Sequence, residues 1–515
     1  MTFCFNILTL LLLLLSSCQK NPSTDRSHLH LNFQEGDIPS LHPHQLVSHM
    51  RGHSLGKLLY EGLVRIDNQG NPSLAGAQSV EISSDGKKYT FKLRDHHWSD
   101  GSKVTAEDYL RTWRHALARG SDCMRPDLFY LIKNGKAAKT GEVSIEDIGL
   151  RSLDSSTLEV TLEYPSPYFL QLLAHPLCAP LKNPQEAPKV FNGPFMVKHW
   201  DKGVCLQLEA NPHFWNARSV QLQQINISCI DDPMTSLYLF EKGQIDWIGD
   251  TLSPLSRESS LKLIDEHQAI CRPVDRFYWL YLNTEQTLLK SAKIRRALSL
   301  TVERDEIIRH ICFGEPMATP MHEAMIPYPQ AWMESTDAVD LFKEGLSELG
   351  LTQETCPPLV LSYARQKPLV EYLKNRWESL FGITIQLQRN EWNVFRSNLA
   401  QGNFEMGGCL DSVIYGDPLE LLERFEELGN YNFSRWEHEP FKKILVSIRE
   451  EMDEEKKIAL LIEAEKILVE EAPIIPIYRC LHVFAHPPGL NNYVFDVGGC
   501  VDFAYAYFTQ RGGAP

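Results

Sequence analysis

The sequence VEISSDGKKYTFKLRDHHWSDGSKVTAED, residues 80–108, holds the local pattern that decides the fold class. Asp85-Gly86 is a strong signal for a tight turn, because glycine tolerates the positive φ angles of hairpin turns. Apolar side chains then occupy alternate positions: Tyr89, Phe91 and Leu93. A period of two is typical of a half-buried strand. Residues 80–94 are therefore predicted to form a β-hairpin.

A helix is predicted to follow the hairpin. Thr105 is a favoured N-cap residue, and Asp108 three positions later completes a variant of the capping box. The alternation of elements continues along the chain. Helical patterns cover 293–300, 303–312, 367–380 and 454–471, and strand patterns cover 156–163, 384–388 and 474–478. Strands that alternate with helices predict an α/β fold.

Composition and charge narrow the class of protein. The chain has 515 residues, of which 43% are hydrophobic and 23% charged, as in globular proteins. This length exceeds one ordinary domain. The formal net charge is −15, and an acidic surface repels the phosphates of nucleic acid. Nucleic acid is therefore excluded as an expected partner.

The N-terminus indicates export. Residues 5–15 are apolar apart from Asn6 and Thr9, which is too short for a membrane span and suits the apolar region of a signal peptide. Residues 15–18, LSSC, resemble the lipobox of bacterial lipoproteins. Residues 1–17 are predicted to be a lipoprotein signal peptide, Cys18 the lipidated residue that anchors the chain to the membrane, and 18–27 a tether. The absence of Lys and Arg from residues 2–5 departs from this pattern, and an apolar N-terminal helix of a cytoplasmic protein is the alternative.

Ten cysteines follow Cys18, and no two of them have CxxC spacing. Zinc-ribbon and thioredoxin-like sites are therefore not expected. Their scattered positions suggest that most are buried thiols.

An ordered series of short motifs begins with Tyr60-Glu61-Gly62-Leu63 and continues through the hairpin and helix of residues 80–108. Later members of the series are Ser166-Pro167-Tyr168-Phe169, Asn192-Gly193-Pro194-Phe195, Asn211-Pro212-His213-Phe214-Trp215, Gly243-Gln244-Ile245-Asp246, Ile294-Arg295-Arg296-Ala297-Leu298 and Ile475-Pro476-Ile477-Tyr478. From about residue 30 onward the series resembles the peptide and nickel class, family 5, of ABC-transporter substrate-binding proteins, in particular its oligopeptide-binding members.

This resemblance implies a two-lobed periplasmic-binding-protein fold, class II-like and of cluster C, with an extra subdomain inserted in the N-terminal lobe. Lobe I would comprise 28–48, 183–270 and 488–515, the inserted subdomain 49–182, and lobe II 271–487. The chain crosses between lobes near 265–275 and 485–492. Proteins of this kind close around a solute by a hinge motion.

The function implied is capture of oligopeptides and their delivery to an ABC permease, which consists of two membrane subunits plus ATPases. The protein would act as a monomer outside the cytoplasm, without enzymatic activity, cofactor or metal. Neither HExxH nor a P-loop occurs in the sequence, and Ser, His and Asp form no ordered constellation.

The resemblance also places the binding site. Family members hold the ligand backbone by β-augmentation, and the matching stretches here contain Ile38 and Pro39 on one lobe and Leu410, Asp411 and Ser412 on the other. Three further matches complete this set: Trp392 as the wall of a side-chain pocket, His175 from the inserted subdomain, and Tyr130.

One position departs from the family pattern. Ile414 stands where an aspartate pairs with the α-ammonium of the ligand. A buried ammonium without a partner is costly, so another acid would have to serve. Asp411 is the favoured substitute and Asp417 the other candidate. The family's disulfide near this site is also absent, since Arg276 and Ser412 occupy its two positions.

Two alternatives remain within the same family. A specialised carrier of murein (cell-wall) tripeptides, or of dipeptides, would suit the loss of the aspartate. A nickel or haem binder would use some of the N-terminal histidines, which are His28, His30, His42, His44, His49 and His53. The simpler interpretation is that these six histidines are surface and loop residues that bind no metal.

Overall fold

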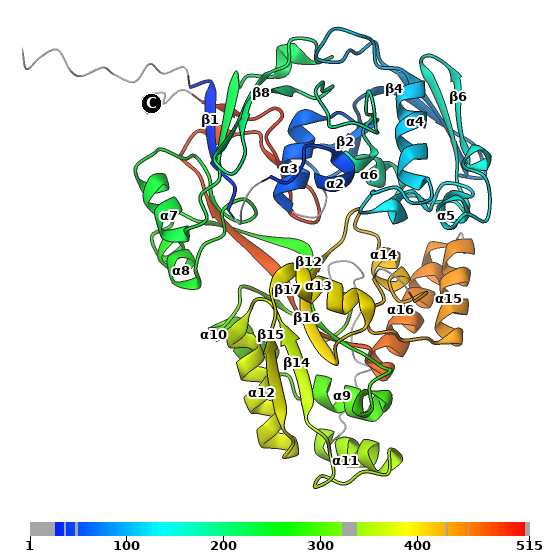
Figure 1. The fold of residues 1–515 in the computed structure, drawn as a ribbon, viewed down its shortest axis with the longest axis vertical. Helices are drawn as coiled ribbons and strands as arrows, with labels where there is room; N and C mark the ends of the chain where they lie inside the picture. The colour runs from blue at the N-terminus through cyan, green and yellow to red at the C-terminus, as the bar shows by residue number, and fades with distance from the viewer. Residues whose placement is uncertain are drawn as a thin grey trace, which may run out of the picture.

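The computed structural model describes residues 26–34, 38–46, 50–321, 337–428, 431–451 and 453–509. The predicted signal peptide 1–17, Cys18 and most of the tether lie outside these residues. Three larger sheets with helices around them, and three two-stranded ladders, form the regular structure of the described part of the chain (Figure 1).

The lobe I sheet has the order β1-β10-β9-β8. Its strands are β1 (His28–Asn32), β8 (Phe195–Asp201), β9 (Cys205–Ala210) and β10 (Gln224–Ser228). β1 pairs with β10 in parallel, with Leu29 opposite Ile225 and Leu31 opposite Ile227. These four side chains are buried in one core. The helices of this part are α2 (Pro43–Leu46), α3 (Met50–Leu59), α7 (Pro233–Glu241) and α8 (Arg257–Asp265).

The C-terminal residues return to the same core. Short strands β18 (Leu490–Asn491), β19 (Val494–Phe495), β20 (Val501–Asp502) and β21 (Tyr507–Phe508) form two small ladders beside the lobe I sheet. Phe495, Val501 and Phe503 pack in the lobe I core with residues from the start of the chain. Segments nearly 500 residues apart therefore share one folding unit.

The inserted sheet has the order β4-β5-β7-β6. Its strands are β4 (Ala77–Ile82), β5 (Lys88–Leu93), β6 (Leu150–Asp154) and β7 (Thr157–Thr161), its helices are α4 (Ala106–Leu117), α5 (Gly135–Thr140) and α6 (Phe169–Leu173), and the small ladder β2 (Val64–Ile66) and β3 (Pro72–Leu74) lies beside it. The predicted hairpin is confirmed as β4 and β5, with Gly86 in the turn at a φ of 67°. The predicted helix is confirmed as α4, where Thr105 N donates to Asp108 Oδ2 at 2.8 Å.

The lobe II sheet has the order β11-β17-β12-β16-β14-β15, and β13 also pairs with β17. Its strands are β11 (Ile248–Gly249), β12 (Ile270–Leu282), β13 (Gly314–Pro316), β14 (Leu359–Tyr363), β15 (Ile385–Arg389), β16 (Met406–Ser412) and β17 (Ile474–Ala485). The helices are α9 (Ala292–Leu300), α10 (Arg304–His310), α11 (Ala338–Glu348), α12 (Lys367–Phe381), α13 (Trp392–Gln401), α14 (Pro418–Glu423), α15 (Glu439–Glu450) and α16 (Glu454–Glu471).

Two long strands connect the lobes. β12 and β17 run from the upper half of the molecule into the lower half (Figure 1). β17 was predicted over 474–478 alone, but it continues to Ala485 because residues 479–485 pair with β12, β13 and β11. The predicted crossings at 265–275 and 485–492 fall at the outer ends of these two strands.

Each of the four large hydrophobic cores draws its residues mostly from one of the predicted domains. One cluster uses residues between Leu63 and Cys178, another uses 29–60, 179–252 and 484–506, and two further clusters use residues between Val274 and Cys480. Helix α3 lies within the predicted insertion 49–182, yet its Leu55, Leu58 and Leu59 pack in the lobe I core. The exact domain boundaries stay a prediction.

Ten cysteines lie within the described residues, and six of them are buried. Arg276 and Ser412, at the positions of the family's disulfide, are register partners in β12 and β16. Within the described ranges, no helix has the length and apolar character that spanning a membrane requires.

Candidate ligand-binding site

A cavity of about 920 Å³ lies where the three parts of the chain meet. Lobe I contributes Gln34 and Pro39, the inserted subdomain His175, and lobe II Trp392 and the end of β16. A volume of this size is at the upper end of the range found for small-ligand sites. The cavity can therefore hold a ligand of several residues' length between the lobes.

Strand β16 presents a free edge to this cavity. Its whole length pairs with β12, from Met406 to Ser412. On the other side, β14 pairs only with Met406 and Gly407. Residues 408–412 line the cavity, and no strand of the described residues covers their second edge. Unpaired N–H and C=O groups at such an edge are a template for an added strand.

Gly408 lies where β16 stops pairing with β14, and little space is left beside its Cα atom. A Cβ atom at this position would lie 2.2 Å from Tyr278 Oη and 2.6 Å from Leu280 Cδ2. A side chain at this position would therefore have to displace the side chains of Tyr278 and Leu280, which pack against β16.

Asp411 lies against the cavity, but its carboxylate is held from the protein side. Oδ2 accepts hydrogen bonds from Trp279 Nε1 at 2.8 Å and Tyr281 Oη at 2.5 Å. Oδ1 lies 3.1 Å from Arg424 Nη1, and Asp411 is 6% exposed. Both oxygens thus have partners within lobe II. An incoming ammonium would have to compete with them.

Ile414 lines the cavity through a loop that Glu420 fixes. The backbone N–H of Ile414 donates to both carboxylate oxygens of Glu420, at 2.8 and 2.9 Å, and Tyr415 N donates to Oε2 at 3.2 Å. Burial raises the pKa of Glu420 to about 7. Sequence reasoning missed Glu420; the Asp-Pro start of a helix at 417–418 was the available clue to its position.

Asp417 does not line the cavity. It is the N-cap of α14, where Oδ1 accepts from Leu419 N at 2.9 Å. The side chain is 5% exposed, and burial raises the pKa of Asp417 to about 6. Its geometry is that of a helix cap.

His175 lines the cavity and has a buried ring nitrogen without a hydrogen-bond partner among the described residues. Nδ1 accepts from Leu177 N at 3.1 Å, so the proton of the neutral ring is on Nε2. Nε2 is buried with no hydrogen-bond partner, and the residue lines the cavity beside His53, whose ring centroid is 4.6 Å away. Burial lowers the pKa of His175 well below its usual value. The ring therefore stays neutral and offers Nε2–H to a ligand acceptor.

Trp392 starts α13 and lines the cavity while half-buried. The guanidinium carbons of Arg365 and Arg396 lie 5.3 and 5.9 Å from its ring centroid. The ring thus has the exposure and position of a pocket wall.

The remaining predicted site residues differ in their positions. Pro39 lines the cavity, whereas Ile38 beside it is 6% exposed and packs in the lobe I core. Tyr130 is partly buried against the inserted core and is not among the lining residues. Seven of the ten predicted positions therefore meet at this cavity: Pro39, His175, Trp392, Leu410, Asp411, Ser412 and Ile414.

Residues Gly52-His53-Ser54-Leu55-Gly56 have the GxSxG pattern of hydrolases. In hydrolases this motif forms a sharp turn between a strand and a helix that exposes the serine. Here it lies within helix α3, and Ser54 is 2% exposed. Its Oγ accepts from Val501 N at 3.1 Å. The serine is thus a packing residue and not an exposed nucleophile.

The described histidines do not gather into a metal site. No group of three or more His, Cys, Asp or Glu with ligating geometry occurs in the described ranges, and His49 lies outside them. The rings of His42 and His44 meet edge to face at 4.9 Å, and the ring of His115 lies 6.3 Å from that of His42. His42 Nε2 is 3.1 Å from the Pro184 carbonyl oxygen.

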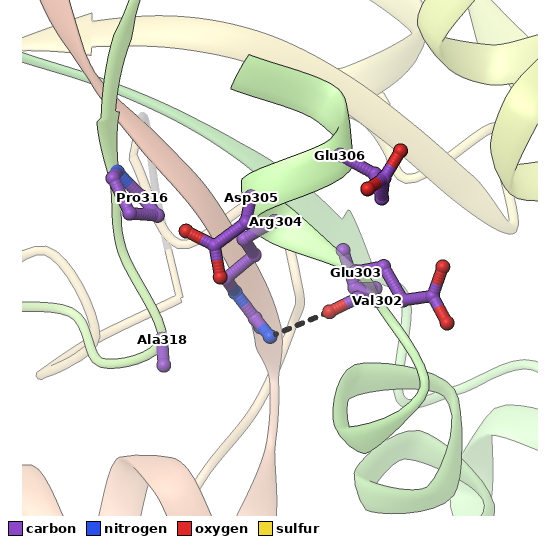
Figure 2. A pocket seen from close by; sticks show the side chains of 7 residues that line it. All are labelled: Val302, Glu303, Arg304, Asp305, Glu306, Pro316 and Ala318. Atoms are coloured by element: carbon purple, nitrogen blue, oxygen red, sulfur yellow. Dashed lines mark hydrogen bonds between the residues drawn. The ribbon is translucent and has the colours of Figure 1, made fainter. Parts of the chain in front are cut away.

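A second hollow of about 510 Å³ lies in lobe II at the start of α10. Figure 2 shows Arg304 and Asp305 projecting from this helix toward Pro316 and Ala318. The Arg304 guanidinium donates to four backbone carbonyls, including those of Met317 and Pro476. Burial lowers the pKa of Arg304 to about 10. This arginine joins α10 to β13 and β17, so we assign the hollow no ligand.

Comparison with known proteins agrees with this architecture. Residues 71–433 match the model of the bacterial extracellular solute-binding proteins, family 5. The oligopeptide-binding protein OppA of Bacillus subtilis is 31% identical over 98% of this chain and 99% of its own length. The periplasmic oligopeptide-binding protein OppA of Escherichia coli is 27% identical over 89% of this chain and 88% of its own.

Among solved structures, the murein tripeptide binding protein MppA of Escherichia coli superposes with a TM-score of 0.83. It is 23% identical and covers 93% of this chain and 98% of its own. The predicted α/β fold of two lobes is thereby confirmed. Together, these matches and the cavity between the lobes show that the chain belongs to the family-5 bacterial extracellular solute-binding proteins.

Proposed function

We propose that this chain is an extracytoplasmic lipoprotein that captures oligopeptides between its lobes and delivers them to an ABC-type peptide permease. The observation that carries the proposal is the free edge of β16 at residues 408–412, facing a cavity of about 920 Å³. A peptide backbone pairs with such an edge whatever its side chains are. Under this proposal the peptide is bound and released without conversion.

Native mass spectrometry of the soluble form that starts at Gln19, purified from a bacterial host, tests the capture of peptides. The proposal expects a spread of adducts with the masses of short peptides, released intact on denaturation. A protein that binds no member of a random tetrapeptide mixture would contradict it. Cleaved peptides would indicate an enzyme instead.

The membrane anchor has its own test. We propose that Cys18 carries the lipid, so Cys18→Ser should abolish incorporation of a labelled fatty acid and release the protein from membranes. Cys4→Ser is the matched control and should leave both unchanged. Uptake of a labelled peptide by cells that lack their own binding protein then tests delivery by a monomeric carrier.

A carrier specialised for murein tripeptides is the second candidate, with dipeptides as a related case. Two observations favour it: Ile414 replaces the expected ammonium-binding aspartate, and Asp411 is already held by Arg424. The relative MppA is described as a murein peptide-binding protein and is 26% identical over 87% of this chain. Competition between a murein tripeptide and a tetrapeptide mixture distinguishes the two candidates.

A further inference from the structure

The lining of the cavity between the lobes differs in charge from the molecule as a whole. Among its described residues are six arginines and four aspartates: Arg51, Arg125, Arg276, Arg365, Arg396, Arg424, Asp122, Asp250, Asp411 and Asp496. Counted over the lining residues, the cavity has a formal surplus of two positive charges, and Asp127, which pairs with Arg125 from outside the lining, offsets one of them. The net charge of the whole chain is −15.

Two of the four aspartates are already paired with cations of the protein. Asp411 is paired with Arg424, and Asp496 Oδ2 lies 2.7 Å from Lys57 Nζ. Each of these pairs is largely buried, and removing one partner of such a pair is costly. Neither carboxylate is therefore a ready partner for a ligand ammonium.

The other two aspartates have neutral partners. Asp122 accepts from the Gln45 side chain at 2.5 Å, and Asp250 accepts from Val483 N at 3.1 Å. Asp122 is exposed, so water weakens its attraction for an ammonium. These two acids are sufficient for a single ligand ammonium.

Two arginines of the cavity lining are not paired with a carboxylate of the described residues. Within the described part of the chain, Arg276 and Arg396 have no carboxylate at ion-pair distance, although both are partly shielded from solvent. Arg276 Nε is buried without a hydrogen-bond partner. Arg396 is held over the rings of Trp392 and Phe433, at 5.9 and 5.5 Å. An arginine guanidinium matches a carboxylate in shape and charge.

His175 Nε2 adds a second unmet donor to the same cavity. The buried lining atoms without a partner also include Gln34 Oε1 and Tyr278 Oη, of which the hydroxyl can donate as well. A buried donor without a partner costs free energy that a ligand acceptor restores. The unmet hydrogen-bonding capacity of the cavity therefore favours a ligand rich in acceptors.

We infer that this cavity selects peptides whose carboxylates outnumber their ammonium groups, and that Arg276 and Arg396 pair with the extra carboxylates. The inference rests on the proposed function and specifies the class of peptide. Asp122 or Asp250 takes the single α-ammonium, and the paired Asp411 and Asp496 stay with their protein partners.

Isothermal titration with three matched tetrapeptides tests the inference: Ala-Glu-Ala-Glu, Ala-Gln-Ala-Gln and Ala-Lys-Ala-Lys. The glutamate peptide should bind at least about tenfold more tightly than the glutamine peptide, as one or two charge-assisted hydrogen bonds would give. The lysine peptide should bind most weakly. Equal affinities, or the reverse order, would overturn the inference while leaving peptide capture intact. Binding of none of the three would contradict the proposed function itself.

Variants locate the effect. Arg276→Gln and Arg396→Gln should each reduce the preference for glutamate over glutamine to about a tenth of its wild-type value, with little change for the glutamine peptide. Arg309→Gln is the control, because Arg309 is 61% exposed on α10 and does not line the cavity. An unchanged preference in both cavity variants would overturn the assignment of these two arginines.

Discussion

At the scale of single residues, Asp411 connects several parts of lobe II beside the cavity. Its carboxylate joins β12, through Trp279 and Tyr281, to Arg424 just beyond α14. The sequence placed Asp411 at the cavity, which the structure also does. The hydrogen bonds from Trp279 and Tyr281 could not be predicted, because these residues lie 132 and 130 positions away in sequence, on another strand.

Asp411→Asn should lower the free energy of unfolding of the protein. The change leaves the Arg424 guanidinium, 7% exposed, with Glu420 at 3.8 Å as its remaining carboxylate, and loss of the nearer charge-assisted pair should cost about 2 kcal/mol. The midpoint of urea unfolding, followed by tryptophan fluorescence, measures it. Asp340→Asn is the control, since Asp340 forms an exposed pair with Lys343 that is worth less than about 1 kcal/mol. Equal shifts for the two variants would contradict the structural role of Asp411.

Glu465 makes stability depend on pH. Its Oε1 accepts from Met321 N at 2.7 Å, and burial raises its pKa to about 7. The folded state therefore retains a proton that the unfolded chain releases near pH 4.5. The native protein should accordingly lose about 2 kcal/mol of stability from this group as pH rises from 5 to 8.

Glu465→Gln should reduce that loss, because glutamine does not titrate. Urea unfolding midpoints at pH 5 and pH 8 measure the difference between the two conditions. Glu463→Gln, on the exposed face of the same helix, should keep the wild-type difference. If Glu465→Gln loses as much stability between pH 5 and pH 8 as the wild-type protein does, the Glu465 carboxyl is not the source of the pH dependence.

At the scale of elements, several contacts join the inserted subdomain to lobe II. Tyr164 Oη lies 3.1 Å from Glu423 Oε1 on α14. Glu423 in turn accepts from Arg449 Nε of α15 at 2.9 Å. Arg125 of the inserted subdomain lies over the ring of Tyr431, 4.6 Å from its centroid. These contacts join two parts of the chain that have separate cores.

Tyr164→Phe should weaken ligand binding by about two- to tenfold, because one hydrogen bond of the closed state is lost. The effect should appear in the dissociation rate, measured by stopped-flow fluorescence with a bound tetrapeptide. Tyr168→Phe is the matched control: Tyr168 packs near Tyr415, and its hydroxyl makes no hydrogen bond within the described residues. A dissociation rate unchanged by Tyr164→Phe would exclude this contact from closure.

Local patterns predicted individual elements well. The hairpin β4–β5, helix α4 and helix α16 lie where turn residues, alternation and capping place them. The second half of β17 was not predicted, because residues 479–485 owe their extended form to three partner strands and not to their own composition. Pairing of distant strands leaves no local periodicity to read.

At the scale of the whole molecule, the arrangement rests on contacts between distant segments. β1 pairs with β10, although His28 and Gln224 are 196 residues apart in sequence. The family resemblance predicted the two lobes and seven of the residues at the cavity. It placed Arg276 near the site but not Arg396, and it did not predict the charge of the cavity, because the charged lining residues come from separate elements that meet only in the folded chain.

The central claim is that a peptide backbone bridges the lobes along the free edge of β16, and amide hydrogen exchange with and without a saturating peptide tests it most directly. The account predicts slower exchange at 408–412 of lobe II and at Ser40 of lobe I, with no change at the outer strand β6 of the inserted sheet. Exchange at 408–412 that the bound peptide leaves unchanged would contradict pairing at this edge.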